Sequence, residues 1–273
     1  MYHLIEKAVR FSILPTMCCV LLCSLFDVAS AQDDISQGGV SHLGESAEEH
    51  LLEPFRSKAH ERWNSEIRKI EARDQAEVDP ADAILFLGSS SVRRWDNIAT
   101  DMAPFRTIQR GYGGAKYSDV AVFAKRLLHP HQYQAMAIFV GNDVQGKPED
   151  HTPDQVEALA RYVVSVSRKH QPEAPVFLIE VTPTSRRYAA WPAIRKVNER
   201  LREVALSTPN THFIATAEHF LDPAGKPRDE FFVSDLLHLN EAGYDQWAAL
   251  IRNRISETLR FKREFEVRKQ LEK

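Results

Sequence analysis

The sequence predicts an α/β fold in which a parallel sheet is buried between two layers of helices, and three observations support this. Short apolar runs alternate with longer stretches of helical periodicity along most of the 273 residues. The runs are apolar throughout, which is typical of strands covered on both faces. A composition of 43% hydrophobic and 27% charged residues is that of a globular chain with room for one large domain.

Five apolar runs are expected to form the strands of this sheet. In chain order they are AILFLG at 83–88, FRTIQ at 105–109, AMAIFVG at 135–141, APVFLIEV at 174–181 and THFIAT at 211–216. A helical pattern separates most of these runs from the next, so the strands are expected to be parallel, with their carboxyl ends at one edge of the sheet.

Helical periodicity is found before the first strand, between the strands and after the last. The predicted helices cover residues 51–75, 92–102, 116–128, 153–170 and 189–207, and a last helix begins near residue 241. In the first of these, apolar residues recur every three or four positions, as in an amphipathic helix.

The first 31 residues have the features of a secretory signal peptide. Two basic residues precede an apolar run, and the small residues ASA follow at 29–31. Cleavage after Ala31 is expected to export the protein to the periplasm or the extracellular medium. The alternative is an uncleaved membrane anchor, but Pro15 and Ser24 interrupt the apolar run.

The remaining chain divides into three parts. Residues 32–50 are polar and rich in Gly and Ser, which predicts a flexible leader. Residues 51–260 carry the α/β pattern, and the charged residues 261–273 are expected to extend the last helix into solvent. All three cysteines lie in the predicted signal peptide, so the exported chain is expected to contain no disulfide. A net charge of −3 argues against nucleic-acid binding.

Residues suited to chemistry follow four of the predicted strands. They are Ser89, Ser90 and Ser91 after the first strand, Gly111, Gly113 and Gly114 after the second, Asn142 and Asp143 after the third, and Asp235 and His238 after the fifth. Taken singly, each is compatible with a turn or a helix cap. Ligands of open parallel sheets bind at the carboxyl ends of the strands, however, so these residues are expected to lie together.

Together these residues suit acyl transfer. A serine hydroxyl needs an adjacent base to become a nucleophile, and His238 is suited to that role. Asp235, three residues earlier, is placed to orient the imidazole. The backbone N–H of Gly114, the side-chain amide of Asn142 and the backbone N–H of the nucleophile are expected to hold the oxyanion.

Other chemistries are less well supported. The chain has no G-x-S-x-G elbow, no H-E-x-x-H and no P-loop, and the glycines at 111–114 lack the spacing of a dinucleotide site. The HPH sequence at 129–131 lies in a predicted helix-to-strand loop and has no evident third ligand. We therefore expect neither a metal nor a cofactor.

The four sequence blocks resemble those of the SGNH hydrolases, also called GDSL-type lipases and acylhydrolases. FLGSSSVRRW resembles the serine block with Ser90 as nucleophile, and RGYGGAKYSDV the glycine block with Gly114. VGNDV resembles the asparagine block with Asn142, and SDLLHLNEAGY the last block with Asp235 and His238. The likeness covers about residues 55–258 and keeps the order of the blocks.

The resemblance implies a three-layer α/β/α, flavodoxin-like fold with a five-stranded parallel sheet, a Ser90–His238–Asp235 triad, an oxyanion hole at Ser90, Gly114 and Asn142, and no metal. Two departures are visible. Ser89 stands where the family's name-giving motif has Asp, and Gly141 directly precedes Asn142, where the third block usually reads Gly-x-Asn-Asp.

The expected function is an exported serine esterase acting on short acyl esters or on O-acetylated carbohydrate. The alternatives are an O-acyltransferase acting on polysaccharide and a non-catalytic carbohydrate- or protein-binding module with the same fold. The segment TSRRYAAW places Arg186, Arg187, Tyr188 and Trp191 near the expected site. One possibility is that these side chains form a substrate-binding rim. The alternative is that the two arginines belong to a solvated loop and that Trp191 is part of the core.

Overall fold

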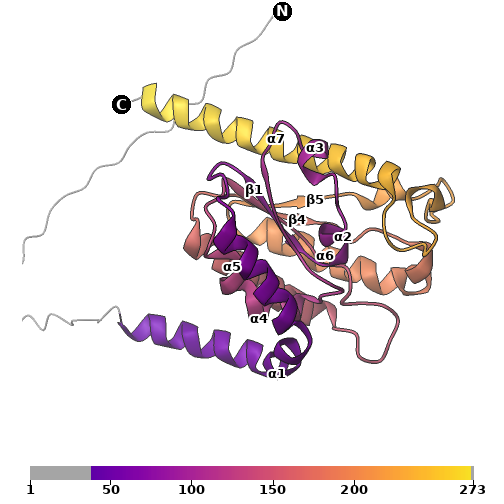
Figure 1. Ribbon diagram of the computed structural model, residues 1–273, viewed down its shortest axis with the longest axis horizontal. Coiled ribbons are helices and arrows are strands. Elements are labelled where there is room, and N and C mark those ends of the chain that lie inside the picture. Colours follow the sequence, from indigo (N-terminus) through magenta and orange to yellow (C-terminus); the bar gives the residue numbers. More distant parts are fainter. Residues whose placement is uncertain (1–37, 272–273) are drawn as a thin grey trace, which may run out of the picture. The chain divides into compact units, whose positions relative to one another are not determined.

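Five parallel strands form the sheet at the centre of the fold (Figure 1). They are β1 Ile84–Gly88, β2 Thr107–Gly111, β3 Ala135–Phe139, β4 Val176–Ile179 and β5 Thr211–Ile214. Their order across the sheet is β2-β1-β3-β4-β5, which is the flavodoxin-like order. The predicted fold class is confirmed, and each strand lies within or close to its predicted run.

The computed structural model describes the backbone of residues 38–271 and the side chains of residues 47–271. Residues from His42 onward form one compact unit, to which the following description applies. The predicted signal peptide and the first part of the predicted leader, up to residue 37, lie outside the described residues. Within residues 38–271, the helices contain no segment that is both long and apolar enough to cross a membrane.

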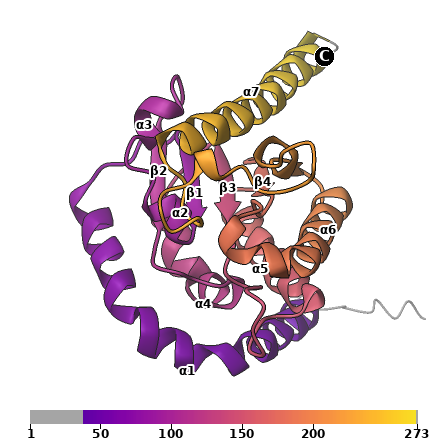
Figure 2. The same cartoon turned by 90° about the vertical axis from the view of Figure 1, so that its right-hand side faces the viewer.

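Helices cover both faces of the sheet (Figures 1 and 2). They are α1 Gly38–Ala76, α2 Ser90–Arg93, α3 Ile98–Asp101, α4 Tyr117–Leu128, α5 Pro153–His170, α6 Trp191–Ser207 and α7 Glu241–Leu271, with short 3₁₀ helices η1 Ser185–Ala190, η2 Ala217–Phe220 and η3 Asp229–Phe231. Strand residues alternate between two cores. Leu85 and Leu87 pack with α1, α4, α5 and α6, whereas Ile84 and Phe86 pack with α2, α3 and α7.

The first helix is longer than the sequence predicts. It begins at Gly38, whereas residues up to 50 were expected to be a flexible leader. Near the end of the predicted leader, charged side chains form ion pairs: Glu48 pairs with Lys169 of α5 at 2.5 Å, and Glu49 with Arg56 at 2.8 Å. Such pairs leave no apolar periodicity in the sequence, which explains the error.

The helix predicted over 92–102 is also corrected by the structure. It is interrupted between α2 and α3 at Trp95, whose side chain is fully buried and whose indole N–H donates to Asp101 at 2.6 Å. Burial of this ring against Phe86 and Trp247 bends the chain toward the core. The other predicted helices are present, and α7 continues to Leu271 through the charged tail, where most side chains after Leu259 are exposed.

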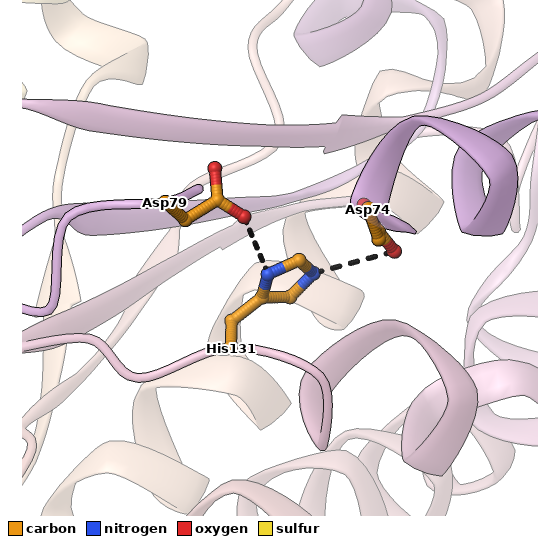
Figure 3. A group of neighbouring side chains, drawn as sticks. All are labelled: Asp74, Asp79 and His131. Carbon is orange, nitrogen blue, oxygen red and sulfur yellow. Dashed lines mark ion pairs between the residues drawn. The ribbon is translucent and has the colours of Figure 1, made fainter. Parts of the chain in front are cut away.

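A largely buried ionic cluster joins the end of α1 to the sheet, and Figure 3 shows three of its members, Asp74, Asp79 and His131. The guanidinium of Arg110, in β2, lies 2.6 Å from Asp74 and 3.0 Å from Asp79. Arg110 Nε donates to His131 Nε2 at 3.2 Å, and His131 Nδ1 lies 2.7 Å from Asp79. Burial, and secondly the charge of Arg110, lower the pKa of His131, which fits a neutral ring that accepts from Arg110 and donates to Asp79.

This cluster also brings together the ligand types of a metal site. Asp74, Asp79 and His131 each offer a ligand atom, and these atoms lie within 4.8 Å of one another. The sequence did not reveal the two carboxylates as partners of His131, because they precede it by more than fifty positions. Arg110 already supplies positive charge to both carboxylates, so a cation bound there would have to displace its guanidinium. The cluster therefore fits a structural tie better than a metal site.

We expect Arg110→Met to lower the free energy of unfolding by about 3–5 kcal/mol, because it leaves two buried carboxylates without their cation. Arg106→Met is the matched control: Arg106 pairs with Asp82 on the surface, where both side chains are about 60% exposed, and its loss should cost less than about 1 kcal/mol. Urea denaturation of both variants measures the difference. Equal, small losses would contradict the structural role of the cluster.

Candidate active site

The residues singled out in the sequence lie at the carboxyl ends of neighbouring strands. Ser90 is the first residue of α2, directly after β1, and Asn142 follows β3, which pairs with β1. The order of the strands reverses between β1 and β3, and ligands of sheets with this order bind at that point. The topology therefore places Ser90 and Asn142 beside the expected binding crevice.

A close approach between β1 and β3 fixes the start of the serine segment. A Cβ at Gly88 would lie 2.1 Å from the carbonyl oxygen of Phe139, so no other residue fits there without displacing the strand. The next residue, Ser89, donates its backbone N–H to that same carbonyl at 3.0 Å. The glycine thus allows the backbone contact that holds Ser89 and, after it, Ser90.

Ser90, His238 and Asp235 form a continuous hydrogen-bonded series. His238 Nε2 lies 3.1 Å from Ser90 Oγ, and His238 Nδ1 lies 2.7 Å from Asp235 Oδ2. Ser90 is therefore the member of the serine triplet that the structure places against the imidazole. These distances fit a hydroxyl, a base and a carboxylate that orients the base.

The loop that carries Asp235 and His238 is shaped by the aspartate itself. Asp235 Oδ1 accepts the backbone N–H groups of Leu237 and His238, each at 2.9 Å. Leu236, which lies between Asp235 and Leu237, has a φ of 55°, in the left-handed region that non-glycine residues rarely adopt. The carboxylate thus holds a strained turn that directs the imidazole toward Ser90.

The carboxyl group of Asp235 is strongly acidic. Its partial burial alone would raise its pKa, but the side-chain hydrogen bond with His238 and the two backbone N–H donors outweigh this effect and lower the pKa to about 2. Arg94 lies 3.8 Å from the same carboxylate. Asp235 is therefore ionised at neutral pH and can stabilise an imidazolium at position 238.

The second and third blocks meet beside this series. Asn142 lines the same pocket as Ser90 and His238, despite the departure in its sequence block. The α-carbon of Gly114 is nearby, because a Cβ built on it would lie 3.8 Å from Asn142 Nδ2. Gly114 is not among the residues that line the pocket. Its neighbour Gly113 has a φ of 31°, and the indole of Trp63 occupies the space a side chain there would need.

Asp143, which follows Asn142, has a structural role. Its carboxylate accepts the backbone N–H of Tyr117, at the start of α4, at 2.9 Å and lies 2.8 Å from His151 Nδ1. Its side chain is almost fully buried, and this burial raises its pKa. These contacts hold the asparagine loop against α4, so Asp143 points away from the chemistry.

The residues of the predicted rim separate into two groups. Arg187 lines the pocket and donates to Asn142 Oδ1 at 2.7 Å. Arg186 and Tyr188 are exposed, and the Tyr188 hydroxyl donates to the carbonyl of Gly225 at 2.9 Å. Trp191 packs against the hydrophobic core. Tyr188 and Trp191 are not among the residues that line the pocket, and the packing of Trp191 fits the alternative that it belongs to the core.

Two threonines in the loop after β4 were not predicted as site residues. Thr182 and Thr184 line the pocket, and their buried hydroxyls have no hydrogen-bond partner among the described residues. Their only sequence signal is their position after a predicted strand, in VTPTSRR. The unpaired hydroxyls give this wall of the pocket hydrogen-bonding capacity.

The pocket beside Ser90 is small. Its volume is about 30 Å³, and one water molecule needs roughly 10–15 Å³ by the same kind of measure. Apolar side chains of Phe139, Phe232 and Trp247 line it together with the polar groups described above. A pocket of this volume has space for a group of two or three heavy atoms.

Residues 86–246 match the model of the GDSL-like Lipase/Acylhydrolase family. A search of the curated proteins finds none that matches this chain.

Solved structures share the fold at low sequence identity. A GDSL-like lipase from Bacteroides thetaiotaomicron VPI-5482 is 18% identical, with 70% of this chain and 98% of that chain covered and a TM-score of 0.60. A lipase/acylhydrolase from Enterococcus faecalis is 20% identical, with 65% and 96% covered and a TM-score of 0.55. A carbohydrate esterase family 3 protein from Talaromyces cellulolyticus is 15% identical, with 66% and 98% covered and a TM-score of 0.51.

The family match spans more than half of the 273 residues and includes the serine, glycine, asparagine and histidine blocks. The resemblance seen in the sequence is thereby confirmed, and the protein belongs to the GDSL-like lipase/acylhydrolase family, a family of ester hydrolases.

Proposed function

We propose that this protein is an exported serine esterase that hydrolyses carboxylic esters with short acyl groups, O-acetylated carbohydrates among them. The observation that carries the proposal is the contact of 3.1 Å between His238 Nε2 and Ser90 Oγ, with Asp235 2.7 Å from the other ring nitrogen. Membership of the ester-hydrolase family supports the same reaction class.

In the proposed reaction, Ser90 Oγ attacks the ester carbonyl while His238 Nε2 takes the hydroxyl proton. Asp235 holds the ring so that Nε2 faces the serine, and its charge stabilises the imidazolium. The backbone N–H groups of Ser90 and Gly114 and the side-chain amide of Asn142 receive the oxyanion. His238 then protonates the departing alcohol, and water, activated by the same imidazole, releases the acid from Ser90.

The size of the pocket supports short acyl groups. A volume of about 30 Å³ beside Ser90 is space for a group of the size of an acetyl. The unpaired hydroxyls of Thr182 and Thr184 in the wall of the pocket further disfavour a long apolar chain, because such a chain offers them no hydrogen-bond partner. Assay of p-nitrophenyl esters from acetate to palmitate tests this preference.

We expect Ser90→Ala to abolish hydrolysis of p-nitrophenyl acetate, because it removes the hydroxyl that lies 3.1 Å from His238 Nε2. Ser89→Ala and Ser91→Ala serve as matched controls and should retain activity within about tenfold, since neither hydroxyl is the one bonded to the imidazole. Steady-state kinetics of the three variants gives the comparison.

Full activity in Ser90→Ala would overturn the proposed nucleophile. Absence of hydrolysis in the wild-type protein, together with transfer of acetyl groups from an ester to an added polysaccharide, would favour the O-acyltransferase. Absence of both reactions on a panel of acetylated sugars, with binding of those sugars retained, would favour the carbohydrate-binding module.

The acid limb of the pH profile should involve one proton. Loss of the general base accounts for one proton, and Asp235 adds none, because with a pKa of about 2 it stays ionised down to about pH 3. We therefore expect log(kcat/KM) to fall with a slope of one per pH unit as the pH drops toward about 4. A slope of two in this range, in a protein that stays folded, would contradict the strongly acidic Asp235.

Export is the part of the proposal that rests on the sequence of residues 1–31. When the full chain with a carboxyl-terminal tag is produced in a bacterial host, the tagged protein should be recovered outside the cytoplasm with Gln32 as its first residue. Amino-terminal sequencing measures this directly. Recovery of the intact chain from the cytoplasm would contradict export.

A further inference from the structure

The side-chain amide of Asn142 is held from two sides. Its Oδ1 accepts a hydrogen bond of 2.7 Å from Arg187 Nη2, and its Nδ2 donates to the carbonyl of Ala115 at 3.1 Å. Asn142 itself is buried, so exchange of either partner for bulk water is restricted. These two contacts determine which way the amide faces.

Only one orientation of this amide satisfies both neighbours. A guanidinium can only donate and a carbonyl oxygen can only accept, so Oδ1 must face Arg187 and Nδ2 must face Ala115. An amide nitrogen carries two hydrogens. One is used on Ala115, and the other has no acceptor among the hydrogen bonds of the described residues, in a side chain that belongs to the lining of the Ser90 pocket.

Arg187 is itself fixed in place. It belongs to η1, which follows β4, and its Nη1 donates to the carbonyl of Gly141 while Nη2 binds Asn142. One guanidinium thus bridges the backbone of Gly141 and the side chain of Asn142. Burial, opposed by Asp150 and Asp143, lowers the pKa of Arg187, but an arginine remains charged at any pH of interest.

We propose that Arg187 is a positioning residue for the oxyanion donor: it sets the orientation of the Asn142 amide and, through its positive charge, strengthens the remaining N–H as a donor. A cation bonded to an amide oxygen polarises that amide, and the effect is larger where water is excluded. The inference rests on the proposed function, because it assigns a support to one of the three proposed oxyanion donors.

The positioning role of Arg187 differs from a role in binding substrate at the rim of the pocket. Both terminal nitrogens of Arg187 have protein acceptors in Gly141 and Asn142, so its charge is already directed at the asparagine loop. It also bears on the departure in the third block, where Gly141 directly precedes Asn142. The guanidinium holds both of these residues from a different part of the chain.

The test is a double-mutant cycle on kcat for p-nitrophenyl acetate with Asn142→Ala, Arg187→Gln and the double variant. Loss of the Asn142 donor should lower kcat by about 10²–10³-fold. Arg187→Gln should lower kcat by about 10–100-fold with KM changed less than about threefold, since the interaction serves the transition state. The double variant should be within about threefold of Asn142→Ala, because Arg187 acts through Asn142.

Two further variants separate orientation from general damage. Arg187→Lys keeps the positive charge, so it should recover part of the kcat lost in Arg187→Gln. The recovery should be incomplete, because an ammonium group lacks the planar fork that bridges Gly141 and Asn142. Arg195→Gln removes the same charge from an exposed side chain of α6 and should leave kcat and KM unchanged. Thermal unfolding of each variant checks that the fold is retained. As a second test, added guanidinium ion should partly restore the kcat of Arg187→Ala.

Other outcomes overturn the inference. Multiplicative losses in the double variant would show that Arg187 acts independently of Asn142, and a rise in KM at constant kcat would show that Arg187 binds substrate. If Asn142→Ala keeps full kcat while Ser90→Ala is inactive, the serine mechanism stands and the positioning role fails. If Ser90→Ala is active, the proposed function fails instead.

Discussion

The hydrogen bond between Ser90 and His238 joins residues 148 positions apart, so the proposed chemistry depends on both ends being held. At the serine end, β1 pairs with a strand on each side, β2 and β3, and this restrains its carboxyl end. At the histidine end, the carbonyl of His238 accepts the backbone N–H of Val233 at 2.9 Å, and Asp235 fixes the ring. The two ends are also tied to each other, because the Tyr244 hydroxyl in α7 donates to the carbonyl of Ser91 at 2.8 Å.

Support from outside the blocks extends to the other two loops. The indole of Trp63, in α1, lies against Gly113, next to the proposed oxyanion glycine. The end of the same helix is tied to β2 through Asp74 and Arg110. Arg187, in η1, holds the asparagine loop. The sheet thus brings the blocks to one edge, and side chains from α1, η1 and α7 hold the loops there.

The sequence was sufficient for the sheet and for the residues at its edge, because buried strands leave apolar runs and the four blocks keep their order. The sequence was insufficient for features that depend on a contact between residues far apart in the chain. Glu48 and Glu49 of α1 make charge pairs that leave no apolar period in the sequence, and the break at Trp95 comes from burial of one ring. The pairing of Arg187 with Asn142 and the cluster around His131 depend on side chains more than forty positions apart. The glycines and serines of a motif could be recognised in the sequence, whereas the side chains that position them, such as Arg187 and Trp63, became visible only in the structure.

The central claim, that Ser90 is a nucleophile activated by His238, is tested most directly by covalent labelling. The folded protein is treated with a fluorophosphonate, and the adduct is mapped by peptide mass spectrometry with fragmentation that separates the three adjacent serines. Our account predicts a single stoichiometric adduct on Ser90, formed far more slowly in His238→Ala. An adduct on Ser89 or Ser91, or labelling of Ser90 at the same rate without the imidazole, would contradict it.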